Sequence, residues 1–177
     1  KKAILKLQSE DGGEESNHKA RLLLREANIL SQIPHLTSQL YMDHGSSNGR
    51  HWLLIREIDG QEVHQVAKET RENIADSKEK ITYLLGFLRR VSGFYDALYT
   101  GGYLHGDVQP AHTYLERDEI AVIDWGLARK IDEPNSLYKG GFIYFVAPEI
   151  AGRMRLGDTT ISYTPRAEVY ALGATLF

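Results

Sequence analysis

The sequence predicts an α+β fold with two lobes, a small strand-rich lobe followed by a larger helical one. Strand-like runs and turn residues dominate up to about residue 58, whereas the strongest helical periodicity comes later in the chain. Because strands and helices are segregated along the chain, we expect separate β-rich and α-rich parts. We place these parts at residues 1–58 and 59–177, within one folding unit of 177 residues.

The first part is expected to hold three strands and one helix. Residues 3–8 alternate weakly between apolar and polar types, which indicates a strand. Apolar residues then recur on one helix face over residues 15–33, and Pro34 is expected to end this helix. Two further strands, at 38–42 and 51–58, flank a stretch rich in Gly, Ser and Asn. This pattern predicts a hairpin.

The second part opens with a polar stretch over residues 61–80 and continues with the strongest helix of the chain, over 81–98. Gly101 and Gly102 are expected to stop this helix.

Two short strands are expected next, at 113–115 and 120–123, joined by a charged turn. Residues 127–141 are polar and are expected to be irregular. Thr164 and Pro165 have the character of a helix cap and a first-turn proline, so we expect a final helix from there onward.

Composition excludes several classes of function. The chain has 21 Lys and Arg against 24 Asp and Glu, a net charge of −3, which argues against a general affinity for nucleic acid or an anionic membrane. It has no cysteine, so disulfide scaffolds, thiol nucleophiles and cysteine metal sites are excluded. No apolar run approaches the roughly 20 residues of a membrane-spanning helix. We expect a cytoplasmic protein.

Two carboxylates stand where an active site could form. Asp107 follows the long helix and precedes a short strand, and Asp124 ends the next strand before Trp125 and Gly126. Either aspartate alone is more often a helix cap or a solvated turn residue. Together they favour a cleft with a catalytic carboxylate and a metal ligand.

These motifs resemble those of the protein kinase superfamily over almost the whole chain. The matching segments, in family order, are Ala3-Ile4-Leu5-Lys6 (V-A-I-K), Glu26 (the lysine-pairing glutamate), His105-Gly106-Asp107 (H-R-D), Asp124-Trp125-Gly126 (D-F-G), Ala147-Pro148-Glu149 (A-P-E) and Glu168 to Gly173 (D-x-W-S-L-G). The resemblance implies a kinase-like bilobal fold that is incomplete at both ends. We expect the family's glycine-rich loop and its C-terminal helices to lie outside this chain, and missing segments or a partner domain to cover both ends.

The resemblance also implies roles for individual residues. Lys6 would contact the α- and β-phosphates of ATP and would be held by Glu26. Asp107 would accept or orient the proton of the acceptor hydroxyl, and Asp124 would bind Mg²⁺.

The adenine site is implied in the same way. Ile55 falls at the gatekeeper position, and Arg56, Glu57 and Ile58 correspond to the hinge that meets adenine through backbone groups.

Three residues depart from the family pattern. Gly106 replaces an arginine, so we do not expect regulation by phosphorylation of the activation loop. Gln109 replaces the catalytic-loop lysine, which removes one cation near the γ-phosphate. His112 replaces the asparagine that binds the second Mg²⁺, and an imidazole is a poor ligand for this ion. Three interpretations of His112 stay open: altered metal binding, a hydrogen bond to Asp107 or a phosphate, or an impaired site.

The expected reaction is transfer of the γ-phosphoryl group of ATP to a hydroxyl, with Ser or Thr of a protein or peptide favoured. The A-P-E motif and the long segment after Asp124 favour a polypeptide acceptor, and kinase domains of lanthipeptide synthetases are one similar group. Two alternatives remain. Gln109 and His112 are also compatible with a pseudokinase, and His-Gly-Asp also occurs in small-molecule kinases.

Overall fold

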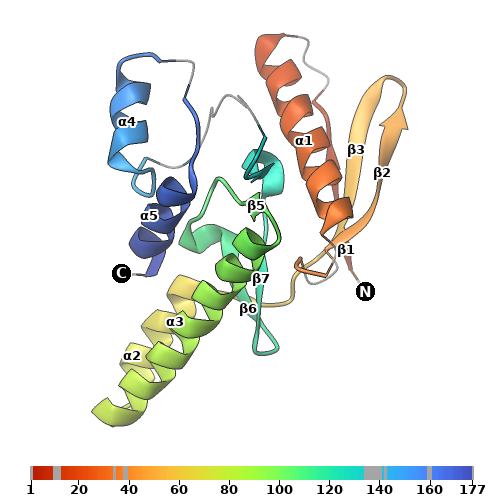
Figure 1. Cartoon of the computed structure of the whole chain (residues 1–177). Coiled ribbons are helices and arrows are strands. Elements are labelled where there is room, and N and C mark those ends of the chain that lie inside the picture. Colours follow the sequence, from red (N-terminus) through yellow and green to blue (C-terminus); the bar gives the residue numbers. More distant parts are fainter. Residues whose placement is uncertain are drawn as a thin grey trace.

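The computed structural model describes residues 2–9, 13–33, 35–37, 40–133, 141, 143–158 and 161–176. Figure 1 shows a sheet of three strands with helix α1 on one side of the molecule, and a group of helices with short strands on the other. The predicted α+β fold is confirmed, and the arrangement is that of a partial kinase-like fold.

The first sheet contains β1 (Ala3–Leu7), β2 (Tyr41–Ser47) and β3 (Arg50–Arg56), all antiparallel, in the order β1-β3-β2. Strand β3 is central because it pairs with both β1 and β2, and its side chains Leu53 and Ile55 belong to the core, with 0% and 4% of their surface exposed. Lys6 of β1 lies directly opposite Leu53, so it shares the core-facing side of the sheet.

The hairpin between β2 and β3 differs from its prediction in position. Strand β2 continues to Ser47, so most of the stretch predicted as a turn is strand. The turn consists of Asn48 and Gly49, which have φ angles of 52° and 74°. Asn-Gly with two positive φ angles suits a tight turn that matches the twist of the flanking strands. The predicted residues 38 and 39 lie outside the described part.

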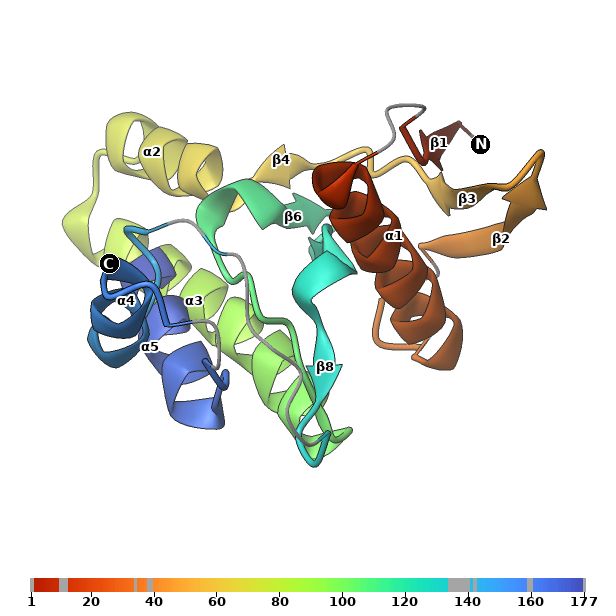
Figure 2. The ribbon, with the colours of Figure 1, turned by 90° about the horizontal axis from the view of Figure 1, so that it is seen from above.

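Helix α1 (Glu14–Gln32) stands between this sheet and the turn η2 (Trp125–Leu127), as Figure 2 shows from above. It was predicted over nearly this range. Its buried residues include Ala20, Ala27 and Leu30, which lie three or seven positions apart and form one apolar face. Pro34 lies outside the described residues.

The second group of elements is mostly helical. Its helices are α2 (Val63–Asn73), α3 (Ser77–Thr100), α4 (Pro148–Arg155) and α5 (Pro165–Leu176). Its short strands are β4 (Gln61–Glu62), β6 (Thr113–Glu116) and β7 (Glu119–Val122) in one sheet, and β5 (Tyr103–Leu104) with β8 (Arg129–Lys130) in another. A second short turn, η1 (Pro110–His112), precedes β6.

Several boundaries here confirm the predictions. Strand β6 contains the predicted strand 113–115, and β7 begins one residue before the predicted strand 120–123 and ends one residue before its end. Helix α3 ends at Thr100, directly before Gly101. Helix α5 begins at Pro165, and the hydroxyl of Thr164 accepts a hydrogen bond from the Ala167 N–H at 3.3 Å, as a cap does.

The polar stretch 61–80 is less irregular than its composition indicates. It holds α2 and the first turn of α3, which starts at Ser77 with the Asp76 carboxylate accepting from the Glu79 N–H at 2.7 Å. Helix α2 buries only Val63, Val66 and Thr70, so most of its surface is polar and its periodicity is weak. Helix α4 was not predicted, and β8 lies within the stretch 127–141 that was predicted to be irregular.

The main core cluster takes residues from both parts of the chain, including Leu30 and Leu53 from the first and Val91, Leu98 and Trp125 from the second. A smaller cluster joins the segment around Leu104 to α4 and α5. The loop after Leu104 therefore runs between two packed regions, which holds its backbone in place.

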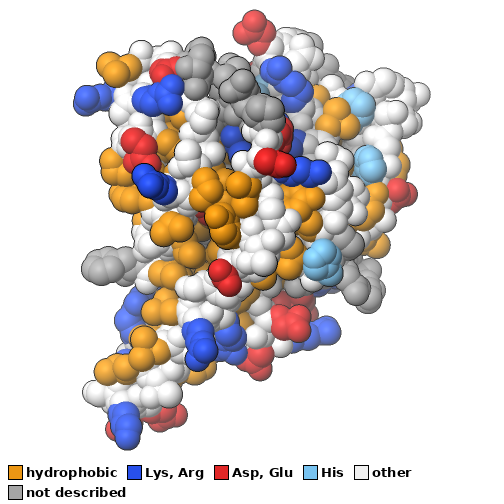
Figure 3. Space-filling view, in the orientation of Figure 1, with side chains coloured by type: hydrophobic (Ala, Val, Ile, Leu, Met, Phe, Trp, Pro, Cys, Tyr) orange, Lys and Arg blue, Asp and Glu red, His pale blue; other side chains and the backbone are white. Residues whose placement is uncertain are grey.

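No described helix has both the length and the apolar composition that crossing a membrane requires. On the face shown in Figure 3, the side chains of Lys and Arg are interspersed with those of Asp and Glu.

Candidate active site

Lys6 of β1 forms an ion pair with Glu26 of α1. Its Nζ lies 2.7 Å from Oε1 and 2.8 Å from Oε2 of the glutamate. The Glu26 side chain is 4% exposed and that of Lys6 is 33% exposed. Burial raises the pKa of Glu26, whereas the charge of Lys6 opposes that rise and the charge of Asp124 adds to it. The Glu26 carboxylate also accepts a hydrogen bond from the backbone N–H of Trp125, the residue after Asp124, so the pair lies close to this aspartate.

His105 anchors the loop that carries Asp107. Its ring is fully buried, and burial lowers its pKa to about 4, so the ring is neutral at pH 7. The Asp107 N–H donates to Nδ1 at 3.3 Å, and Nε2 lies 3.1 Å from the Ile123 carbonyl oxygen. Since a carbonyl only accepts, the proton is on Nε2. The ring thus links the loop to the strand end just before Asp124.

Glu168 of α5 holds the same loop from the opposite side. The N–H groups of His105 and Gly106 donate to its two carboxylate oxygens at 2.6 and 3.0 Å. Burial raises the pKa of Glu168, and the two N–H donors oppose this rise. Glu168 stands where the kinase pattern has an aspartate, and its carboxylate binds the loop backbone at His105 and Gly106.

Gln109 contacts Asp107 rather than open solvent. Its Nε2 donates to Asp107 Oδ1 at 3.1 Å, and the Asp107 side chain is 14% exposed. This amide can fix the direction of the carboxylate, although it supplies no positive charge.

Asp124 has an unusual backbone conformation, with φ 61° and ψ 68°. A residue other than glycine is seldom found in this left-handed region, and such strain is concentrated at functional sites. The Asp124 side chain is 53% exposed, so its carboxylate is available to a ligand.

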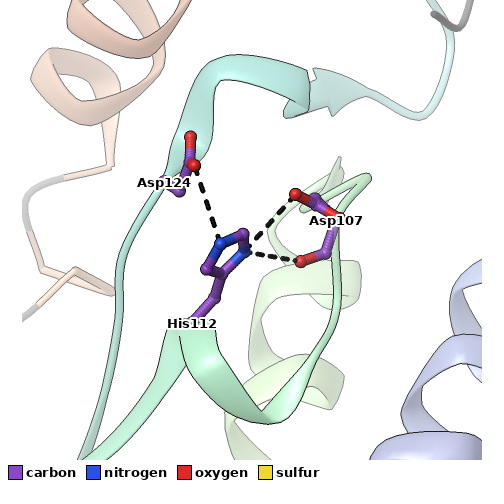
Figure 4. Close-up of side chains that lie close together, drawn as sticks. All are labelled: Asp107, His112 and Asp124. Atoms are coloured by element: carbon purple, nitrogen blue, oxygen red, sulfur yellow. Dashed lines mark hydrogen bonds and ion pairs between the residues drawn. The ribbon is translucent and has the colours of Figure 1, made fainter. Parts of the chain in front are cut away.

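His112 lies between the two aspartates, as Figure 4 shows. Its Nδ1 is 3.1 Å from the Asp107 carbonyl oxygen and 3.4 Å from Asp107 Oδ2, and its Nε2 is 3.6 Å from Asp124 Oδ2. One ligand atom from each of the three residues lies within 4.8 Å of the others, so together they could hold a metal ion. The two carboxylates suit Mg²⁺, whereas the imidazole does not.

The residues expected at the adenine site are at the end of β3 and directly after it. Ile55 is buried opposite Ile4, and Ile58 packs against the main core. The Glu57 N–H donates to the Lys2 carbonyl oxygen at 3.1 Å, so this group extends the pairing between β1 and β3. The contacts of this segment with adenine stay a prediction.

Glu116, on the hairpin β6–β7, binds Arg56 and the backbone of Asp59 and so holds residues 56–59 in place. The sequence pattern did not indicate this residue. Its two carboxylate oxygens accept from the Arg56 guanidinium, each at 2.7 Å, and Oε1 also accepts from the Asp59 N–H at 2.7 Å. Both charged side chains are largely buried, at 19% and 11% exposed. No sequence signal indicates this contact, because Arg56 and Glu116 are 60 positions apart.

Glu116→Gln is expected to lower the free energy of unfolding by about 2 kcal/mol, because the largely buried Arg56 guanidinium loses the carboxylate that accepts from both of its terminal nitrogens. Hydrogen bonds from Arg56 hold the pKa of Glu116 below its usual range. The stabilisation is therefore complete above the ordinary pKa of a glutamate and disappears as the pH falls through the lower, folded value. Urea unfolding at pH 7 and near pH 3 measures both effects.

The matched control is Glu119→Gln, since Glu119 is exposed and pairs with Glu116 across the same hairpin. An equal loss of stability in both variants at pH 7 would contradict the role assigned to the contacts of Glu116 with Arg56 and Asp59.

Comparison with known proteins finds serine/threonine-protein kinases at low identity. The chain is 26% identical to PknD of Mycobacterium tuberculosis over 178 residues, covering 97% of this chain and 24% of PknD. It is 26% identical to PknH of Mycobacterium bovis over 158 residues, covering 86% of this chain and 24% of PknH. Protein 040L of Invertebrate iridescent virus 3, named as a candidate serine/threonine-protein kinase, is 24% identical over 185 residues, covering 92% of this chain.

The chain spans about half the length of protein 040L, at 52%, and about a quarter of PknD, at 24%. No protein-family model matches the chain. The comparisons therefore show a distant similarity of this chain to serine/threonine-protein kinases.

Proposed function

We propose that this chain forms the core of an ATP-dependent phosphotransferase that modifies a serine or threonine hydroxyl in a protein or peptide. The observation that carries the proposal is the convergence of the Lys6–Glu26 pair with Asp124 and Asp107 in one region of the fold. Phosphoryl transfer needs positioning and charge neutralisation more than covalent catalysis, and this set of groups can provide both.

Each residue has a separate task in this proposal. The Lys6 ammonium neutralises phosphate oxygens of ATP, and Glu26 holds that ammonium in place through two short hydrogen bonds. Asp107, oriented by Gln109, takes the proton of the acceptor hydroxyl. The acceptor oxygen bonds to the γ-phosphorus while the bond from that phosphorus to the β–γ bridging oxygen breaks, and ADP leaves.

Asp124 offers the hard oxygen ligand that Mg²⁺ requires and is 53% exposed, so it is the residue that would hold this ion. When bound, Mg²⁺ would offset the negative charge of the phosphate oxygens.

The choice of acceptor rests on two supports. The relatives reported above bear the name of serine/threonine-protein kinases. The sequence also carries Ala147-Pro148-Glu149 after a long segment, which favours a polypeptide acceptor. These supports do not extend to a lanthipeptide synthetase, so the proposal stops at a protein or peptide.

One alternative is a protein that binds nucleotide or a partner without catalysis. It is motivated by Gln109, which brings no cation to Asp107, and by His112, which places an imidazole between the two aspartates.

The test is transfer of labelled γ-phosphate from ATP to protein and peptide acceptors, using the full-length protein that contains this chain. Lys6→Met is expected to reduce the transfer rate by about 10²-fold, because the ion pair that positions the phosphates is lost. Lys2→Met is the matched control, since Lys2 is 86% exposed and pairs only loosely with Glu57, at 3.7 Å.

Equal phosphate incorporation by the wild type and Lys6→Met would overturn the proposal. Stabilisation of the wild type by ATP without any transfer would favour the non-catalytic alternative.

A further inference from the structure

The direction of the His112 ring is defined by its contact with the Asp107 backbone. His112 Nδ1 lies 3.1 Å from the Asp107 carbonyl oxygen. A carbonyl oxygen can only accept a hydrogen bond, so Nδ1 carries a proton. In the neutral ring, the lone pair of the imidazole is then on Nε2.

That lone pair faces a second acceptor. Nε2 is 3.6 Å from Asp124 Oδ2. This separation is longer than the roughly 2.7–2.9 Å of a hydrogen bond between charged groups. It is closer to the spacing of roughly 3.0–3.4 Å between neighbouring ligands of one octahedral or tetrahedral ion, at metal–ligand distances of about 2.1 Å. The geometry thus suits a cation between Nε2 and Asp124 better than a direct contact.

The surroundings of the ring match those of a metal ligand. A histidine that binds a metal through one nitrogen usually donates its other N–H to a carbonyl or carboxylate, which orients the ring. His112 does this with the Asp107 carbonyl oxygen, and its side chain is only 15% exposed. The Asp107 carboxylate lies within reach of the same position.

We propose that His112 Nε2 and Asp124 bind a first-row transition-metal dication, such as Mn²⁺ or Co²⁺, in preference to Mg²⁺. Imidazole nitrogen favours these ions over Mg²⁺, which prefers oxygen ligands and near-ideal octahedral geometry. The inference deepens the proposed function, on which it rests only in that nucleotide phosphates would complete the coordination of the ion.

The test is metal binding by the full-length protein after removal of bound ions by a chelator. Electron paramagnetic resonance follows free Mn²⁺, and competition with Mg²⁺ gives the ratio of the two affinities. His112→Asn is expected to lower the Mn²⁺-to-Mg²⁺ affinity ratio by about tenfold or more. The visible absorption of Co²⁺ depends on its ligands and coordination geometry, so it should change in the same variant.

His64→Asn is the matched control, since His64 is 52% exposed and pairs with Glu62 outside this cluster. His112→Gln serves as a second substitution if His112→Asn does not fold. An unchanged affinity ratio and an unchanged Co²⁺ spectrum in a folded His112 variant would overturn the inference.

The two proposals fail separately. Binding of Mn²⁺ that depends on His112, in a protein that transfers no phosphate, would support the metal site and contradict the phosphotransferase. Phosphate transfer with an affinity ratio that does not depend on His112 would do the reverse.

Discussion

Asp107→Asn is expected to slow phosphoryl transfer by about 10²–10⁴-fold, the range that a positioned general base contributes. The amide of asparagine keeps an oxygen that can accept from Gln109, so the local hydrogen bond at 3.1 Å can persist. It cannot take the proton of the acceptor hydroxyl. The loss should therefore appear in the rate of transfer, whereas stabilisation of the protein by nucleotide stays close to that of the wild type.

Asp118→Asn is the control for the same change of chemistry. Asp118 is 87% exposed on the hairpin β6–β7 and has a φ of 69°, a conformation that asparagine also tolerates. Rates are compared in single-turnover experiments with labelled ATP. A rate for Asp107→Asn within a few-fold of the rate for Asp118→Asn would remove Asp107 from the catalytic role.

Gly106→Ala is expected to lower the free energy of unfolding by about 3 kcal/mol, for two reasons that act together. Gly106 has a φ of 81°, which costs any residue with a side chain. A Cβ at this position would also clash with the backbone oxygen of Leu127. Because Gly106 donates to Glu168, a shift of its backbone would also disturb the loop that carries Asp107.

Gly102→Ala separates the two contributions. Gly102 has a similar φ of 87°, but nothing lies within 4 Å of a Cβ built there. This control is expected to cost about 1 kcal/mol, from backbone conformation alone. Urea unfolding of the two variants gives the difference. Equal losses would show that the contact with Leu127 relaxes without cost.

The position of Gly106 also bears on the sequence comparison. The family pattern has an arginine there, and its replacement led us to expect no regulation through phosphorylation of the activation segment. The structure adds a local reason for glycine, since the carbonyl of Leu127 occupies the space that a Cβ would need. Residues 134–140 of that segment lie outside the described part, so the absence of this regulation stays a prediction.

The elements that sequence predicted well are those with strong apolar periodicity or a clear boundary residue. Helices α1 and α3 each present one buried face, and Gly101 and Thr164 mark ends that the structure confirms. Helix α2 was missed because it buries few side chains, and its polar composition resembles that of a loop. The predicted end of β2 was wrong because the strand contains glycine and serine, which are typical of turns.

The residues of the candidate site could also be predicted only in part. The motifs and their resemblance to the kinase pattern singled out Lys6, Glu26, Asp107, Asp124 and His112, because residue types and their order are properties of the sequence itself. The contacts of Glu116 with Arg56 and Asp59 could not be predicted, because Glu116 is far from both residues in sequence and meets them only when the chain folds.

The sequence by itself therefore determined the class of fold, the order of its main elements and the acidic and basic residues with which any chemistry here must be done. Only the tertiary structure decided how those residues act on one another. In the folded chain, His112 Nδ1 lies within hydrogen-bonding distance of the Asp107 carbonyl oxygen, and Nε2 lies on the side of Asp124. The physical reason is that ring orientation depends on acceptors supplied by separate segments of the chain, and their positions are defined only when both core clusters are packed.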